Sequence, residues 1–214
     1  MKVSVIMRCK NEERHIGYAI QSVLDFLPDS EIIIVDDNSV DNSREVISLF
    51  KTRNYPIKII DLETKYTPAA SINLALKKCK NDIVLILSSH CEIRSLDIVN
   101  VSNSLKKYKC VFGKQIPIYQ GKKITPRYIW SHFIDEEVVN MYSNIEDRHF
   151  LHNAFAFYDR KYLLNNQFDE FYQGKEDRFW ARDLVKAGEK FLYDPNLIVN
   201  HFWTPNGATW KGIG

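Results

Sequence analysis

Short apolar runs alternate with longer mixed segments over the first ninety residues or so of the chain. Four of these runs have the length of a buried strand: Val3–Met7, Ile32–Val35, Ile57–Ile60 and Ile83–Leu87. Continuous apolar strands are typical of a parallel sheet that helices cover on both faces. The pattern therefore predicts four parallel strands in this part of the chain.

The segments between these runs carry apolar residues at helical spacing. Three helices are predicted from the positions Ile16, Ile20, Val23, Leu24 and Leu27, then Val46, Ile47 and Phe50, then Ile72, Ala75, Leu76 and Cys79. Thr67 and Pro68 are typical of the cap and the first position of the third helix. Strand and helix thus alternate in three units, which indicates an α/β fold.

After Leu87 the rhythm changes to an α+β pattern. We predict a helix within Ser95–Leu105, a strand at Val111–Ile118 and a hairpin or loop around Gly121. A later helix carries Phe179, Trp180, Asp183, Leu184 and Ala187 at helical spacing and ends at Gly188, with Glu176 and Asp177 at its start. No internal repeat or Pro/Gly-rich linker interrupts the chain, so we expect a single domain of residues 1–214.

Composition fits one globular domain and argues against several classes. The chain has 214 residues, 45% of them hydrophobic, and a net charge of +2, which favours neither nucleic acid nor an anionic membrane. Its longest apolar runs are about five residues, too short to span a bilayer, and it opens directly into a strand rather than a signal peptide. We expect a cytoplasmic protein without a transmembrane segment, and leave open peripheral contact at the inner face of the membrane.

The second strand ends abruptly in carboxylates and turn-forming residues. A parallel strand delivers such residues to the carboxyl edge of the sheet, where open α/β folds bind ligands, so Asp36 and Asp37 are ligand candidates. An equally good interpretation is that these acids only form a turn and cap the next helix.

The loop after the first strand excludes common nucleotide-binding folds. It reads Arg8–Glu13 and contains no glycine, whereas a dinucleotide-binding dehydrogenase needs Gly-x-Gly-x-x-Gly there. The chain also lacks the phosphate loop of P-loop enzymes and the Gly-x-Ser-x-Gly of α/β-hydrolases.

Several motifs, taken in order, resemble glycosyltransferase family 2, which has the GT-A fold. They are Val3–Glu13, Ile34–Asp41, Lys65–Asn73, Ile83–Leu87, Phe150–Ala154 and Glu176–Ala181. The resemblance implies a mostly parallel, Rossmann-like sheet with helices on both faces. It also implies a nucleotide-sugar-binding half at residues 1–92 and an acceptor-binding, catalytic half with α+β character at 93–214.

What the resemblance implies for function is inverting transfer of a sugar from a nucleotide-sugar donor to the hydroxyl of a glycan or lipid-linked acceptor. Such reactions build cell-surface polysaccharides and related glycans. The Gln-x-x-Arg-Trp signature of processive members is absent, so we expect non-processive transfer.

The same resemblance implies a donor site at the carboxyl edge of the sheet. Its candidate residues are Arg8, Asn11, Glu12, Asp37, Lys65, Ser89 and His90. Asp37 would bind the base, whose N–H donors suit a carboxylate acceptor, and the first loop would lie against the nucleoside. Instead of binding the donor, Arg8 and Glu12 could form an ion pair at the start of the helix. The alternative for Lys65 is a side chain that is simply exposed to solvent.

The fourth strand departs from the family pattern. Family members usually carry Asp-x-Asp, which binds a divalent cation, but this chain has Ser88–Glu92, with His90 in place of the second Asp. Imidazole suits manganese better than magnesium. Two hypotheses stay open: His90 and His201 bind a metal, or no metal is used and His90 with Lys65 or Lys211 neutralises the departing phosphate.

Catalysis is assigned to the pair that resembles the Glu-Asp of the family. Inversion needs a carboxylate that takes the proton of the acceptor hydroxyl, and we predict Asp177 in this role. Glu176 would bind the acceptor or tune the pKa of its neighbour, although both acids could simply cap a helix. His152, Asn153 and Trp203 are candidates for contact with the acceptor or the donor sugar.

Two other classes of function remain as alternatives. The lost Asp-x-Asp suggests a non-catalytic nucleotide-sugar binding module. A nucleotidyltransferase has a similar sheet, but it would carry a glycine-rich phosphate loop after its first strand.

Overall fold

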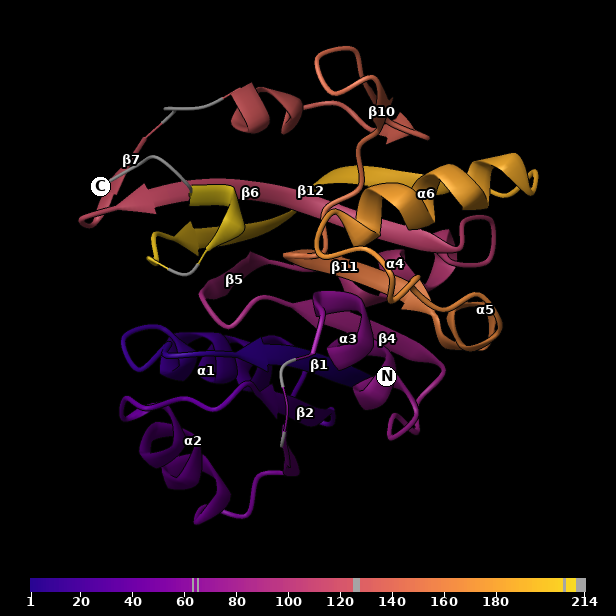
Figure 1. Ribbon diagram of the computed structural model, residues 1–214. Coiled ribbons are helices and arrows are strands. Elements are labelled where there is room, and N and C mark those ends of the chain that lie inside the picture. The colour runs from indigo at the N-terminus through magenta and orange to yellow at the C-terminus, as the bar shows by residue number, and fades with distance from the viewer. Residues whose placement is uncertain (63, 65, 125–127, 206, 211–214) are drawn as a thin grey trace.

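The computed structural model describes residues 1–62, 64, 66–124, 128–205 and 207–210. Within these ranges one sheet of ten strands runs through the molecule in the order β3-β2-β1-β4-β11-β6-β12-β5, with β7 paired to β6 and β8 to β12. Figure 1 shows the first strands and their helices below, and the later strands with α6 above. The same sheet therefore passes through both the earlier and the later part of the chain.

The first four strands are parallel, as predicted. They are β1 (Val3–Cys9), β2 (Glu31–Asp36), β3 (Ile57–Asp61) and β4 (Ile83–Leu87). Strand β1 lies between β2 and β4, with Ile6 paired to Ile33 on one side and to Ile86 on the other. All five residues of β4 are buried, because helices cover both faces of the sheet here. These strands confirm the predicted α/β fold with a mostly parallel sheet.

Alternate residues of β1 reach two separate cores. Val3, Val5 and Met7 pack with the apolar sides of α1 (Ile16–Phe26) and α2 (Ser43–Lys51). Ile6 packs on the opposite face with α3 (Pro68–Leu76). The predicted start of α3 is confirmed, since the Thr67 hydroxyl accepts a hydrogen bond from the Ala70 N–H and proline occupies the first turn.

The later strands extend this sheet with mixed directions. They are β5 (Cys91–Ser95), β6 (Cys110–Tyr119), β7 (Lys122–Lys123), β8 (Val138–Val139), β11 (Phe155–Asp159) and β12 (Phe191–Phe202). Strand β11 is antiparallel to both β4 and β6, while β12 is parallel to β6 and antiparallel to β5. The strands β6 and β7 form the hairpin considered around Gly121, which has a φ of 73°.

The remaining elements are mostly short. They are α4 (Ile98–Ser104), α5 (Arg160–Asn165), α6 (Glu176–Lys186), the two-stranded sheet β9 (Tyr142–Ser143) and β10 (Arg148–His149), and the 3₁₀ turns Tyr128–His132 and Ala208–Trp210. Gly188, with a φ of 81°, follows the end of α6 as predicted. No helix in the described ranges is both long and apolar enough to cross a membrane.

A bulge in β12 brings its backbone very close to β6. The register between the two strands shifts between Asp194 and Ile198, and Gly113 of β6 lies beside this shift. A Cβ at Gly113 would lie 2.5 Å from the Leu197 carbonyl oxygen and 2.6 Å from a ring carbon of Phe155. The close approach therefore requires glycine at this position.

Candidate active site

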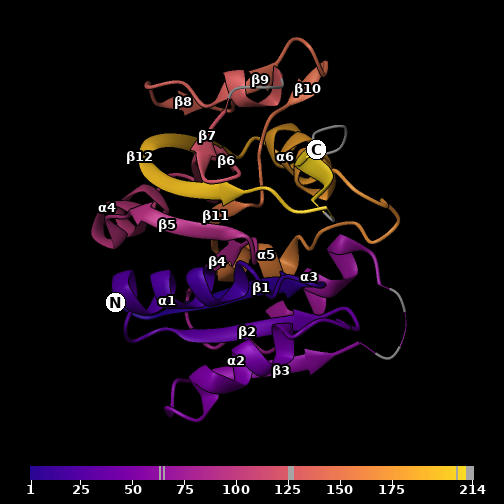
Figure 2. The same ribbon diagram turned by 90° about the vertical axis from the view of Figure 1, so that its left-hand side faces the viewer.

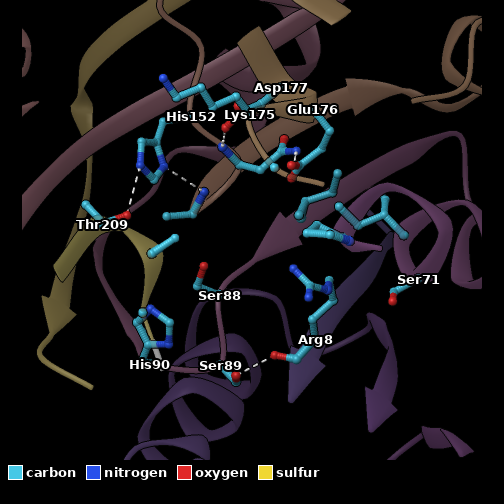
Figure 3. Close-up of a pocket in the computed structure, with 18 of the residues that line it drawn as sticks. Arg8, Ser71, Ser88, Ser89, His90, His152, Lys175, Glu176, Asp177 and Thr209 are labelled. Carbon is cyan, nitrogen blue, oxygen red and sulfur yellow. Dashed lines mark hydrogen bonds between the residues drawn. The ribbon is translucent and has the colours of Figure 1, made fainter. Parts of the chain in front are cut away.

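A cleft of about 460 Å³ opens at the carboxyl ends of β1, β2 and β4. Its walls include most of the residues predicted from the sequence: Arg8, Glu12, Asp37, Ser89, His90, His152, Asn153, Glu176, Asp177 and His201. They come from the ends of β1, β2 and β4 and the loops that follow them, from the loop before β11, from the start of α6 and from the end of β12. Figure 3 shows Arg8, the serines and His90 on one side of the cleft, facing His152 and the acid pair on the other.

The two acids that end β2 have different surroundings. Asp36 is fully buried and accepts hydrogen bonds from the Arg44 guanidinium at 2.8 Å and from the Ser39 backbone at 3.2 Å. Asp37 instead lines the cleft and forms an ion pair with Lys10 at 2.9 Å. Asp36 therefore stabilises the turn, whereas Asp37 faces the cleft and stays a candidate for ligand binding.

Asn11 supports the cleft from outside its lining. Its left-handed backbone, with a φ of 54°, lets its N–H donate to the Ser39 hydroxyl, while its side-chain oxygen accepts from the Val40 N–H at 2.8 Å. These bonds fasten the loop after β1 to the loop after β2.

Glu12 is a buried partner of His90. Its Oε1 accepts hydrogen bonds from Nδ1 of His90 at 3.0 Å and from the Thr204 hydroxyl at 3.3 Å. No ion pair between Arg8 and Glu12 occurs in the described part of the chain, and Glu12 instead hydrogen-bonds to His90. Glu12 thereby fixes the orientation of the His90 ring.

Three histidine rings meet at one end of the cleft. The centroid of His201 lies 4.9 Å from that of His90 and 6.3 Å from that of His152. Burial lowers the pKa of both His152 and His201 well below the ordinary value, with nearby positive charge adding to the effect, so both rings are neutral. In His201, Nδ1 lies 2.7 Å from the Gln115 side-chain oxygen, which can only accept, and the buried Nε2 has no hydrogen-bond partner.

The imidazoles of His90 and His201 have the chemistry of ligands to a transition-metal ion. A neutral imidazole whose Nδ1 donates to a carboxylate or amide oxygen presents Nε2 as a ligand, and such second partners orient metal-binding histidines. Glu12 and Gln115 are partners of this kind for His90 and His201. Among the residues described, no group of three or more His, Cys, Asp or Glu side chains is placed to bind a metal. In the described residues, the two imidazoles of His90 and His201 are thus the groups available to a metal at this end of the cleft.

Asp177 is the more completely bonded acid of the pair that begins α6. Its Oδ1 accepts from the Arg178 N–H, and its Oδ2 accepts from the Asn153 N–H and the Arg178 guanidinium, both at 3.0 Å. A carboxylate has about four lone-pair positions, so these three bonds leave one on Oδ1. The ion pair with Arg178 also holds this carboxylate in one orientation.

Glu176 is buried beside Asp177 with fewer partners. The Asn153 side-chain amide lies 3.5 Å from its Oε1. Burial, reinforced by the charge of Asp177, raises the pKa of Glu176 from 4.5 to about 7. The folded protein therefore retains the Glu176 proton into the neutral range.

This raised pKa makes folding stability depend on pH. The folded state binds the Glu176 proton more tightly than the unfolded state, so the stabilisation is complete below pH 4.5 and is lost as the pH rises to about 7. Glu176→Gln cannot ionise, so its stability relative to wild type should rise by about 1–3 kcal/mol between pH 5 and pH 8. Thermal melts of both proteins across this range would measure the change. A stability difference that does not vary with pH would contradict the raised pKa.

Sequence reasoning did not identify Arg178 or Glu146 as site residues. Arg178 is buried, donates to the Leu151 carbonyl at 2.6 Å, lies 4.4 Å above the Phe150 ring and reaches Glu146 at 3.6 Å. The charged triplet at the start of α6 could have marked Arg178. Nothing marked Glu146, which comes from the turn between β9 and β10 and lines the cleft.

The other predicted residues lie elsewhere. Lys65, and Lys211 with it, falls outside the described residues. Trp203 is absent from the described lining of the cleft. Its ring packs against Tyr119 at 5.6 Å, and its carbonyl lies 3.1 Å from Nε2 of His15. The segment after Trp203 does reach the cleft, where Thr209 lies 3.3 Å from His152.

Comparison with known proteins identifies relatives of this chain. The family model described as Glycosyl transferase family 2 matches residues 4–165. Poly-beta-1,6-N-acetyl-D-glucosamine synthase from Staphylococcus epidermidis is 34% identical over 88 residues, which cover 41% of this chain and 21% of that protein. The chain thus aligns with about a fifth of the length of this curated relative.

Solved structures share the fold at low sequence identity. S. aureus TarS 1–349 in complex with UDP-GlcNAc has a TM-score of 0.74 and 20% identity, covering 100% of this chain and 62% of that one. GalNAc-T7 with UDP, GalNAc and Mn²⁺ has a TM-score of 0.75 and 17% identity, covering 97% of this chain and 45% of that one. Both similarities bear on the fold alone.

Proposed function

The chain belongs to glycosyl transferase family 2, and from this premise we propose that it transfers a sugar from a nucleotide-sugar donor to an acceptor hydroxyl with inversion, one residue per encounter. The observation that carries the proposal is a single cleft at the carboxyl edge of the parallel strands. Asp37, Asp177, His90 and His201 all line this cleft. A glycan or lipid-linked acceptor of the cell surface is the proposed substrate, in keeping with the polysaccharide synthase among its relatives.

The donor base would bind at Asp37. This carboxylate directly follows β2, lines the cleft and can accept a hydrogen bond from a ring N–H of the base. The UDP-GlcNAc in the TarS structure supports a uridine nucleotide as the first donor to test. Ser89 would hold the end of β4 against the end of β1, because its hydroxyl donates to the Arg8 carbonyl.

Asp177 would act as the catalytic base. Its remaining lone pair on Oδ1 can accept the proton of the acceptor hydroxyl as the oxygen attacks the anomeric carbon from the side opposite the diphosphate. Asn153 and Arg178 would keep this carboxylate oriented through the three bonds described above. The neighbouring Glu176, protonated at slightly acidic pH, could donate a hydrogen bond to the acceptor or to the donor sugar. His152 and Asn153 line the same part of the cleft and are proposed to contact the sugar.

The residues present fit a divalent cation bound by His90 and His201. Bound there, a cation would supply positive charge to the leaving diphosphate. The two imidazoles favour manganese over magnesium, and the Mn²⁺ in the GalNAc-T7 structure supports the same choice. Metal-independent transfer remains the alternative, in which His90 donates to the phosphate directly.

A thermal-shift screen tests the proposed donor and metal. UDP at a hundred times its dissociation constant should stabilise the protein by about 2.7 kcal/mol, which raises the Tm by roughly 5–10 °C for a chain of this size. Manganese should add to the UDP shift, whereas His201→Asn, which lacks the Nε2 ligand, should lose only the manganese increment. If manganese and chelator give equal UDP shifts in wild type, the metal-independent alternative holds.

Turnover separates an enzyme from a binding module. The proposed enzyme should release UDP slowly from UDP-GlcNAc or UDP-glucose even without acceptor, since water can replace the hydroxyl. Binding of these donors without any hydrolysis or transfer would favour the non-catalytic module suggested by the missing Asp-x-Asp.

A further inference from the structure

Arg8 is a partly buried guanidinium without an anionic partner. It belongs to β1, lines the cleft, and among the described residues its side chain makes no hydrogen bond or ion pair. Burial lowers its pKa, an effect that Glu176, when it is ionised, and Asp37 oppose from a distance. Removing a guanidinium from water without a bonded anion is costly, so this arrangement suits a site that a ligand completes.

The other cations around the cleft are already engaged or solvated. Lys10 pairs with Asp37 at 2.9 Å, and Arg178 pairs with Asp177 at 3.0 Å. Lys175 lines the cleft but is exposed to water. Arg8 is thus the cation in the described lining that is both shielded from water and not bonded to a carboxylate.

The groups beside Arg8 leave room for an anion. Figure 3 shows Arg8 extending into the cleft beside Ser88, on the side opposite the acid pair of α6. Ser88 and Ser89 are uncharged, so the end of β4 brings no carboxylate that would repel a phosphate or compete for Arg8. Glu176 retains its proton into the neutral range, which reduces the negative charge on the opposite side. Because Arg8 lies on a strand rather than a loop, its backbone is already fixed for binding.

We propose that Arg8 binds an anionic group of the donor through paired N–H bonds rather than lying against the nucleoside. A guanidinium presents parallel donors that match two oxygens of a phosphate or a carboxylate. The diphosphate is one source of such oxygens and a carboxylate on the donor sugar is the other. This inference rests on the proposed function, since it assumes that a nucleotide-sugar occupies the cleft.

Calorimetric titration in the presence of chelator tests the assignment with UDP, uridine, UDP-glucose and UDP-glucuronate. In Arg8→Gln, UDP and both nucleotide-sugars should bind about 10- to 100-fold more weakly, while the affinity for uridine stays within threefold. Arg8→Lys keeps the charge but loses the paired donors, so its affinities for UDP and the nucleotide-sugars should lie between those of wild type and Arg8→Gln. Arg182→Gln is the matched control, because Arg182 pairs with Asp183 and is absent from the described lining, so its affinities should equal those of wild type.

The pattern of losses identifies the anion. Weaker binding of UDP assigns Arg8 to the diphosphate, whereas a loss confined to UDP-glucuronate assigns it to a sugar carboxylate. Equal losses for uridine and UDP, or no loss for any ligand, would overturn the proposal.

Two further readouts make the test independent of the donor and of folding. If wild type binds no nucleotide, the proposed function fails, but titration with inorganic pyrophosphate still tests Arg8, and equal binding by wild type and Arg8→Gln would overturn its role. Because the Arg8 side chain makes no bond in the described protein, Arg8→Gln should melt no lower than wild type without ligand. A lower Tm would instead indicate a structural role.

Discussion

Replacing Asp177 with asparagine should lower the rate of sugar transfer by about 10²–10⁴-fold while donor affinity stays within a few-fold of wild type. An amide cannot take the proton from the acceptor hydroxyl, so the loss should appear in kcat. The donor contacts proposed at Asp37 lie at another wall of the cleft and are unchanged by the substitution. Single-turnover transfer from UDP-GlcNAc, together with UDP titration, would measure the two effects separately.

The control for this variant lies on the same helix. Asp183→Asn removes a carboxylate from α6 that pairs with Arg182 and is absent from the described lining of the cleft, so transfer should continue at the wild-type rate. Asp177→Asn also places an amide where Oδ2 now accepts two bonds, so its Tm must be compared with that of wild type. If Asp177→Asn retained full turnover while Glu176→Gln lost it, the base would be Glu176.

Replacing Gly113 with alanine should destabilise the protein by about 3 kcal/mol and lower its Tm by roughly 6–12 °C. The added methyl group would lie 2.5 Å from the Leu197 carbonyl oxygen and 2.8 Å from its Cβ, where β12 bulges toward β6. Neither atom belongs to the end of a flexible side chain, so the strands themselves would have to separate. Thermal or urea unfolding would measure the loss.

A second glycine provides the matched comparison. Gly17 lies in α1, and a Cβ there would meet only a methyl carbon of Val46 at 3.4 Å. Gly17→Ala should therefore leave stability unchanged or raise it by up to about 1 kcal/mol, since alanine favours a helix. Equal Tm values for the two variants would show that the bulge yields more easily than the geometry indicates.

The first part of the fold could be predicted because the hydrophobic pattern of the sequence there matches the burial of the same residues in the structure. Strands β1, β2 and β4 are apolar runs that are almost fully buried, so their sequence alone indicates buried strands. Strand β3 is also rich in isoleucine, although it lies at the edge of the sheet and is partly exposed. Strands β5 and β11 were not predicted. Phe155–Asp159 becomes a strand because β4 and β6 lie on either side of it, and this pairing depends on distant segments. Cys91–Ser95 is short and mixed in polarity, which suits the edge position it occupies.

The candidate site shows the same division between local and distant causes. Asp37, His90 and Asp177 follow strands or begin a helix within readable motifs, and all three line one cleft. Their catalytic and binding roles stay predictions. Gln115 and Glu146 were missed because each acts through a partner far away in sequence, His201 in one case and Arg178 in the other. No spacing rule connects such pairs, since their contact arises only when the sheet is complete.

Strand β5 follows β4 directly in sequence but lies at the far edge of the sheet, where Cys91 pairs with His201. Its Ile93 N–H also donates to the Ser22 hydroxyl of α1 at 3.0 Å, so it joins the first helix to the last strand (Figure 2). Closing a loop of more than a hundred residues is slow compared with forming local helices. During synthesis β5 therefore cannot pair within the sheet until β12 has left the ribosome. Refolding should accordingly be limited by this late closure rather than by assembly of the parallel strands.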